Sequence, residues 1–168
     1  MDETGLFYSL VPDRTIAQQR SAGCKKEKTR ITLALTANAD GTEKLPPLFI
    51  GHAKKPRCFN RRSGDDYGFL YRSNSNAWMT AELFQEWLRN FDQRMRVAGR
   101  HILLFIDNAP SHTTEVDLPN VELCCIPPNT TSVIQPMDAG IIAAFKRRYR
   151  RYHLQNAVDR DERGERNP

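Results

Sequence analysis

The stretch His101-Ile102-Leu103-Leu104-Phe105-Ile106-Asp107 decides the fold class of this chain. Five consecutive apolar residues between polar ones predict a strand that is buried on both faces, which is typical of a parallel sheet. A second apolar run at 121–126 predicts a neighbouring strand of the same kind. Residues 81–97 precede the first strand and predict an amphipathic helix with Thr80 as its N-cap. The expected apolar stripe of this helix comprises Phe84, Trp87, Leu88, Phe91 and Met95.

Further strands are expected upstream of this unit. Segment 30–37 alternates apolar and polar residues and predicts a strand, and Asp40-Gly41 supplies a turn after it. Segment 45–51 predicts the returning strand, although its prolines confine the ladder to 48–50 or to a sheet edge. Residues 52–76 are polar and rich in turn formers, which predicts a loop.

The C-terminal part predicts one long helix that begins near Pro136 or Met137 and ends near Val158. Its expected apolar stripe comprises Met137, Ile141, Phe145, Tyr149 and Tyr152. Residues 159–168 are almost wholly charged, so we expect a disordered tail after a domain of residues 1–158. The order of elements predicts an α/β fold with a mixed sheet flanked by helices.

Composition narrows the classes of function. The chain has 168 residues, a net charge of +5 and a pI of about 9.2, which fits one domain with a preference for polyanions. No apolar run is long enough to predict a transmembrane span, and the acidic start is unlike a secretory signal. The four cysteines form no C-x-x-C pair, which favours reduced thiols over a zinc site or a disulfide framework. A site drawing on His52 and Cys58 is the remaining zinc alternative.

Two acidic residues stand at positions where ligands are often bound. Asp107 follows the apolar strand 102–106, and ligands in open α/β sheets bind beyond the carboxyl ends of parallel strands. Asp138 lies at the start of the last predicted helix. Each also has a structural interpretation: Asp107 could form an Asx-turn, and Asp138 could complement the helix dipole. The pattern alone leaves both interpretations open.

Three local motifs carry a family resemblance. Asp2-Glu3-Thr4-Gly5, Asp107-Asn108-Ala109-Pro110-Ser111-His112 and the segment 127–140 resemble, in order, the acidic motifs of the DDE superfamily endonucleases. The group in question contains the pogo and Tigger transposases and the jerky-like and centromere-protein-B-like proteins. Thirty residues separate Asp107 from Asp138, which matches the pogo-type spacing. The resemblance covers about residues 1–150.

This resemblance implies an RNase H-like fold in which Asp2, Asp107 and Asp138 are the catalytic residues and the metal ligands. They would hold two Mg²⁺ ions, or Mn²⁺, for hydrolysis of DNA phosphodiester bonds and then strand transfer. It also implies DNA as the partner, a nuclear location and assembly into homo-oligomers. Neither a membrane nor a small-molecule cofactor is expected.

Other residues receive weaker assignments from the same motifs. Asn108 and His112 would orient Asp107 or contact the phosphate, although His112 could instead pack in a turn. Gln135 and Asn129 would position the third acid, touch DNA or serve the turn. Glu3 is either an outer partner of the site or a surface acid.

Two groups of basic residues could meet phosphates, or could simply face solvent. The first group, on the last predicted helix, comprises Lys146, Arg147, Arg148, Arg150 and Arg151. The second comprises Lys25, Lys26, Lys28 and Arg30.

The position of Asp2 sets a further expectation. Only Met1 precedes it in the given sequence, whereas the family carries its first aspartate on a central strand that would pair with both 31–37 and 102–106. We therefore expect a truncated central strand, and a chain that by itself folds poorly or is inactive. A non-catalytic nuclear DNA-binding protein and an inactive remnant of a mobile element are the alternatives to a working transposase domain.

Overall fold

The structure is a computed structural model, and it describes residues 1–9, 29–113, 115–127, 130 and 135–164. Within them, strands β1 (Asp2–Phe7), β2 (Arg30–Leu35), β3 (Leu48–Gly51) and β4 (Leu70–Ser73) form one sheet in that order. The β1–β2 and β2–β3 pairs are antiparallel and the β3–β4 pair is parallel, so the sheet is mixed. Strands β5 (Ile102–Ile106) and β6 (Val121–Cys125) form a separate parallel pair. This is the expected α/β class with a mixed sheet and helices.

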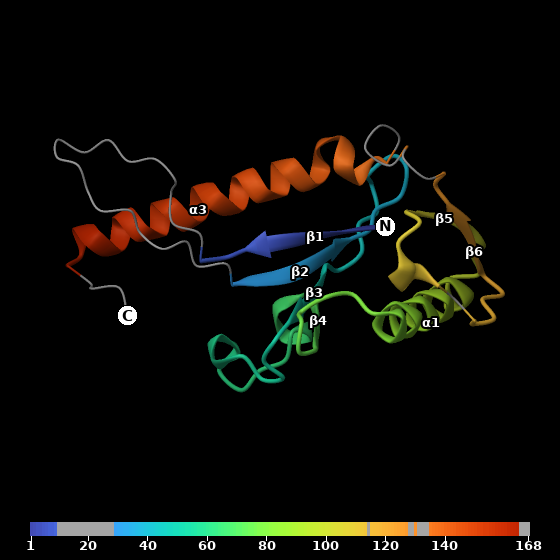
Figure 1. Cartoon of the computed structure of the whole chain (residues 1–168), viewed down its shortest axis with the longest axis horizontal. Coiled ribbons are helices and arrows are strands. Elements are labelled where there is room, and N and C mark those ends of the chain that lie inside the picture. The colour runs from blue at the N-terminus through green and yellow to red at the C-terminus, as the bar shows by residue number, and fades with distance from the viewer. Residues whose placement is uncertain (10–28, 114, 128–129, 131–134, 165–168) are drawn as a thin grey trace.

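Among the described residues, strand β1 lies at the edge of its four-stranded sheet. It pairs with β2 along its whole length, from Asp2 opposite Leu35 to Phe7 opposite Arg30. Towards β5 the structure records one main-chain bond, in which the N-terminal amine of Met1 donates to the Phe105 carbonyl at 2.9 Å. From Asp2 onwards, β1 runs away from the β5–β6 pair, as Figure 1 shows. Strands β1 and β5 therefore lie side by side only at the start of β1.

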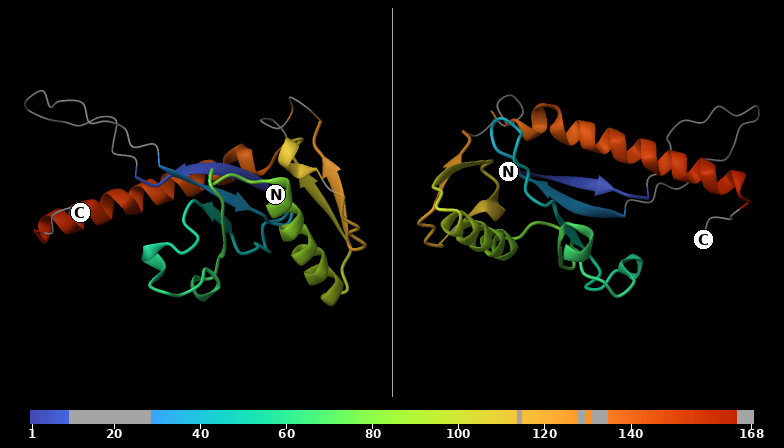
Figure 2. Two further views of the ribbon diagram at one scale, coloured as in Figure 1. Left: turned by 60° about the horizontal axis from the view of Figure 1, so that its bottom comes forward. Right: turned by 180° about the vertical axis from the view of Figure 1, so that it is seen from behind.

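Helix α1 (Ala81–Val97) confirms the prediction for its range, cap and buried face. The Thr80 hydroxyl accepts a hydrogen bond from the Leu83 N–H at 3.3 Å, which satisfies one of the free donors of the first turn. The whole predicted stripe is buried, with Phe84 and Leu88 fully enclosed. These side chains share one core with residues of β2, β3, β5 and β6. Helix α1 therefore ties the mixed sheet to the β5–β6 pair, and Figure 2 shows it lying between them.

Two predictions about the strands were wrong. The predicted loop 52–76 contains β4, together with short 3-10 helices at Arg57–Phe59 and Asp65–Tyr67. Strand β5 is buried on one face only, because Leu103 and Phe105 are 49% and 51% exposed. These residues alternate with buried Leu104 and Ile106, so the apolar run does not indicate burial on both faces.

The last predicted helix is broken near its start. A π-helical turn (Met137–Ile141) precedes α3 (Ile142–Glu162), and Gly140 within that turn has a φ of 144°, outside the helical range. Helix α3 continues past 158, the expected end of the domain, to Glu162. Ile141 and Tyr152 of the predicted stripe are exposed, whereas Met137 is buried and Ile142 takes a buried position next to the break. No helix among the described residues is long and apolar enough to cross a membrane.

Candidate acidic site

The side chain of Asp2 is enclosed at the start of β1. The residue is only 5% exposed, and its Oδ2 atom has no hydrogen-bond partner in the described part of the chain. Burial raises the pKa of Asp2 to about 7, with the negative charges of Asp138, Glu3 and Asp107 adding to the effect and a backbone hydrogen bond from Glu3 opposing it. A buried carboxylate oxygen that accepts no hydrogen bond needs a bound proton or a cation to offset its charge.

Both other predicted aspartates act electrostatically on Asp2. Asp138 lies exposed in the π-helical turn and affects the Asp2 pKa more strongly than Asp107 does. Gln135, just before that turn, is 2% exposed and donates from Nε2 to the Met1 carbonyl at 3.1 Å. This bond fastens the segment that carries Asp138 to the start of β1. Gln135 is therefore enclosed beside the acids and does not lie on a surface that DNA could touch.

A second, closer group of acidic and imidazole side chains joins Glu3, Asp107 and His112. One ligand atom from each of them lies within 4.8 Å of the others. His112 Nε2 lies 2.9 Å from Glu3 Oε1, and His112 Nδ1 lies 2.6 Å from Asp107 Oδ1. The imidazole is buried and packs on the Phe84 ring with 4.4 Å between the ring centroids. His112 thus bridges β1 and the end of β5 across 109 positions of sequence.

The charge of His112 follows from these contacts. Burial by itself would lower the pKa of His112, but the hydrogen bond and charge of Glu3, together with Asp107, outweigh it and raise the pKa. A protonated imidazole donates from both nitrogens, which suits a carboxylate on each side. Asp107 Oδ1 also accepts the Ala109 N–H at 3.2 Å, so the Asx-turn interpretation of Asp107 is confirmed. These bonds fix the orientation of Asp107, whichever ligand it meets.

The free ligand atom lies on Asp2, whereas the ligand atoms with metal-sized spacing belong to Glu3, Asp107 and His112. Both nitrogens of His112 already contact carboxylates, so the group of Glu3, Asp107 and His112 is an internally satisfied ion cluster. Asp2, in contrast, has an unpartnered oxygen and is influenced by the charges of Asp138 and Asp107, although among the described residues these three acids do not form a group with metal-ligand spacing. Hard carboxylate oxygens are the ligands that Mg²⁺ prefers. The alternative zinc site gains no support, because His52 Nδ1 lies 2.8 Å from the Ser75 carbonyl, and Cys58 belongs to no metal-sized cluster among the described residues.

The remaining predicted residues lie on exposed or undescribed parts of the chain. Asn108 is exposed next to Asp107, and Arg147 and Arg150 are exposed on α3, whereas Lys146 is half-buried. Arg30 lies over the Trp78 ring, 4.6 Å from its centroid. Asn129, Lys25, Lys26 and Lys28 lie outside the described residues. Sequence reasoning named Glu3 and His112 separately and missed their ion pair, for which no local pattern exists.

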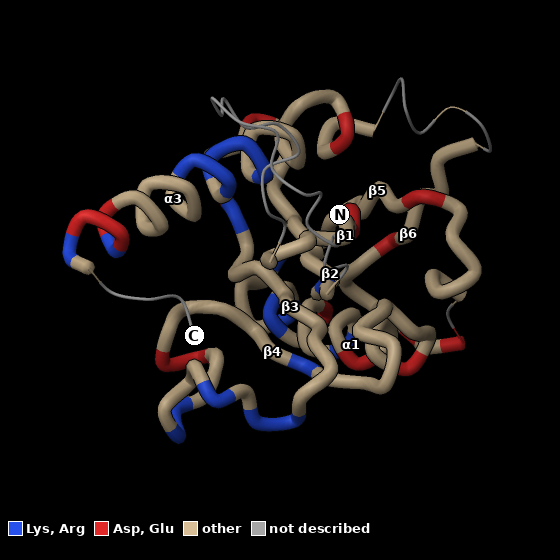
Figure 3. Tube along the Cα trace, turned by 60° about the vertical axis from the view of Figure 1, so that its left-hand side comes forward, with Lys and Arg blue, Asp and Glu red and all other residues tan. Residues whose placement is uncertain are grey.

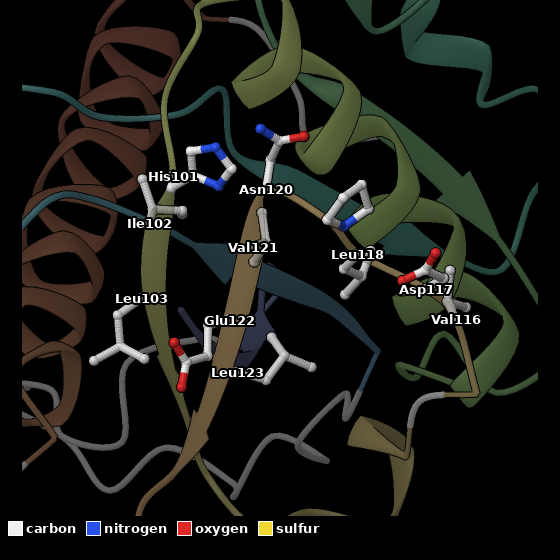
Figure 4. A pocket seen from close by; sticks show the side chains of 11 residues that line it. His101, Ile102, Leu103, Val116, Asp117, Leu118, Asn120, Val121, Glu122 and Leu123 are labelled. Atoms are coloured by element: carbon white, nitrogen blue, oxygen red, sulfur yellow. The ribbon is translucent and has the colours of Figure 1, made fainter.

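The hollow shown in Figure 4 is a different place from the acidic site. Its volume is about 660 Å³, and it is lined by the starts of β5 and β6 and by residues 116–120. His101 and Asn120 lie at this end, whereas Asp107 follows the opposite end of β5. The hollow therefore contributes nothing to the carboxylate group.

This protein is an α/β domain with a mixed sheet. Its acidic side chains lie where the start of β1 approaches the end of β5. The chain belongs to the DDE superfamily endonuclease family, whose family model matches residues 28–167. It is 38% identical to CENP-B homolog protein 2 of Schizosaccharomyces pombe over 92% of this chain and 32% of that protein. It is also 38% identical to mouse Tigger transposable element-derived protein 4, over 88% of this chain and 29% of that protein.

A third relative is the human major centromere autoantigen B, which is 32% identical over 93% of this chain and 25% of that protein. The relatives place the chain in the pogo and Tigger group, as its motifs predicted. The chain spans about a third or less of the length of these proteins. No solved structure matches it.

Proposed function

We propose that this chain is the catalytic domain of a DDE-type transposase, with an RNase H-like fold, that cuts DNA phosphodiester bonds and joins the freed 3′ end to a target strand. The observation that carries the proposal is the buried, unpartnered Oδ2 of Asp2 beside the charges of Asp138 and Asp107. Such a concentration of negative charge costs stability unless a proton or a cation offsets it. Family membership supports DNA as the substrate.

In this proposal Asp2, Asp107 and Asp138 hold two Mg²⁺ ions. The bound ions would supply an activated nucleophile and charge neutralisation at the leaving oxygen. Asp2 approaches the site from β1, Asp107 from the end of β5 and Asp138 from the π-helical turn, so three separate segments must be in place together. His112 and Glu3 keep the carboxylate of Asp107 in one orientation through the 2.6 Å and 2.9 Å contacts.

The basic residues of α3 are the proposed contacts to the DNA backbone in this domain. Arg147, Arg148, Arg150 and Arg151 are exposed. Phosphate contacts position the duplex without reading its sequence. We expect the protein to act in the nucleus, where its DNA substrate lies, and to work as a homo-oligomer.

The test is cleavage of a supercoiled plasmid with Mg²⁺ or Mn²⁺ by a protein that extends this chain upstream of Met1, and by two matched variants of that protein. Asp107→Asn should abolish metal-dependent nicking, whereas Asp117→Asn, which removes an exposed acid between β5 and β6, should leave it intact. Nicking that survives Asp107→Asn would refute the proposed mechanism. Salt-sensitive DNA binding by the wild-type chain without metal-dependent nicking would favour the second candidate, a DNA-binding protein that has lost catalysis, for which the exposed arginines of α3 provide the surface.

A further inference from the structure

Residues 52–72 form a folded, positively charged lobe to which neither the motifs nor the acidic site assigns a role. We call this segment the basic lobe. It contains six basic residues, Lys54, Lys55, Arg57, Arg61, Arg62 and Arg72, and two acidic ones, Asp65 and Asp66. Figure 3 shows its basic residues on the side of the molecule away from the basic stretch of α3.

Aromatic packing gives the basic lobe a defined shape. The Phe59 ring packs edge-on against Tyr71 and Phe69, with centroid distances of 4.9 and 5.7 Å. The Tyr71 hydroxyl donates to the Ala53 carbonyl at 2.7 Å and so joins the two ends of the lobe. Gly64 is buried so tightly that a Cβ atom there would lie 2.7 Å from the Phe69 carbonyl oxygen. The backbone that carries the basic side chains is therefore held in place.

Most of the positive charge on the basic lobe is not neutralised within the protein. Arg72 forms an ion pair with Glu86, but no ion pair involves the other five basic residues in the described part of the chain. These five are exposed. Asp66 accepts hydrogen bonds from the Ser63 N–H and hydroxyl at 2.7 and 3.0 Å, so its carboxylate is turned to the lobe's own backbone. A cluster of exposed basic side chains without ion pairs favours the binding of a polyanion.

The charged side chains surround a concave surface. A hollow of about 1010 Å³ is lined by residues of the lobe. Its lining includes all six basic residues, together with Phe59 and Tyr71. Basic side chains around a hollow focus the electric field more strongly than the same charges on a convex surface.

The lobe lies close enough to the acidic site for one DNA duplex to contact both. It begins after Gly51, the last residue of β3, and Ile50 pairs with Thr32, which pairs with Gly5. Asp2 lies three residues from Gly5 along β1, which is about 10 Å at ~3.3 Å per residue. The lobe extends further from that row, as Figure 1 shows. The two steps from β1 across β2 to β3 add about 10 Å at ~4.8 Å each, so the start of the lobe lies about 15 Å from Asp2, within one DNA helical turn of ~34 Å.

We propose that the basic lobe binds the sugar-phosphate backbone of duplex DNA beside the acidic site. The inference rests on the proposed function, because it names a further contact for the same DNA. The lobe contributes charge and a fixed concave shape, so the contact is independent of base sequence. Arg57 and Arg62 are the residues that we expect to make phosphate contacts, since both are exposed and both line the hollow.

The test measures binding without cleavage, in EDTA, by fluorescence anisotropy with two unrelated labelled duplexes. The double variant Arg57→Gln/Arg62→Gln should reduce the slope of log K against log salt by about 1.8, at about 0.9 per lost phosphate contact. Its affinity should fall roughly tenfold or more at about 0.1 M salt, equally for both duplexes. Both side chains are exposed, so the melting temperature should stay the same.

The matched control is Arg89→Gln/Arg96→Gln, which removes the same charge from exposed positions on α1. Its salt slope should equal that of the wild type. Equal losses in the two double variants would show a net-charge effect and overturn the proposal, as would an unchanged slope in the lobe variant. A wild-type chain that does not bind duplex DNA at all would instead refute the proposed function on which the inference rests.

Discussion

Replacing Asp2 with Asn should make the stability of this protein less dependent on pH. The pKa of the Asp2 carboxyl is raised from 3.8 to about 7 by burial, with the charge of Asp138 as the next cause. Below about pH 4 both the folded and the unfolded chain hold this proton, so it does not affect folding. Between about pH 4 and 7 the unfolded chain releases the proton and the folded chain keeps it, so stability falls as the pH rises.

The size of the effect follows from the shift in pKa. A rise of about 3 units corresponds to about 4 kcal/mol, at about 1.4 kcal/mol per unit. The wild type should therefore lose about 4 kcal/mol more than Asp2→Asn between about pH 4 and about pH 8. Absolute stabilities are a poorer measure, because the Asn amide brings a buried donor that costs about 1–3 kcal/mol if it is unpaired.

The assay is urea unfolding followed by circular dichroism at a series of pH values, with Asp117→Asn as the control for loss of an exposed acid. The curve of the control should run parallel to that of the wild type. Mg²⁺ at about 100 times its Kd should then restore about 2.7 kcal/mol to the wild type at about pH 8, and much less to Asp2→Asn. Parallel pH curves for the wild type and Asp2→Asn would refute the view that Asp2 is a buried, strained carboxylate.

Three further changes test the fold that holds the site. Phe84→Ala should destabilise the chain by about 3–5 kcal/mol in urea unfolding, because this fully buried ring supports His112, and a loss below about 1 kcal/mol would contradict that packing. Thr80→Ala should lower the unfolding free energy by about 1 kcal/mol through loss of the cap on α1, and Thr80→Ser should retain most of it. Asp92→Ala should cost about 1–3 kcal/mol, because Asp92 Oδ1 accepts the buried Asn120 N–H at 2.7 Å, and an unchanged unfolding midpoint would show that this bond is dispensable.

The elements that were predicted correctly depend on neighbours in sequence. Helix α1 was predicted from Thr80 and from an apolar stripe at helical spacing, and both signals lie within the helix or next to it. Strand β4 was missed because Leu70–Ser73 becomes a strand by pairing with β3, more than twenty positions upstream at Leu48. Propensity does not report a partner at that separation.

The same distinction applies to the candidate site. Asp2, Asp107 and Asp138 were named from motifs, and their joint role as metal ligands stays a prediction. The Glu3–His112 pair was not predicted, since its two members approach only after β1 and the segment following β5 have folded together. The break at Gly140 was also missed, because a glycine in a helical pattern does not by itself indicate a positive φ.

That break has a mechanical consequence. Asp138 lies on one side of Gly140, on a turn that Gln135 anchors to the start of β1, and the arginines of α3 lie on the other side. A continuous helix would make the direction of α3 set the position of the Asp138 carboxylate. Because the backbone leaves helical geometry at Gly140, the bond from Gln135 to Met1 can hold Asp138 in place independently of the direction of α3.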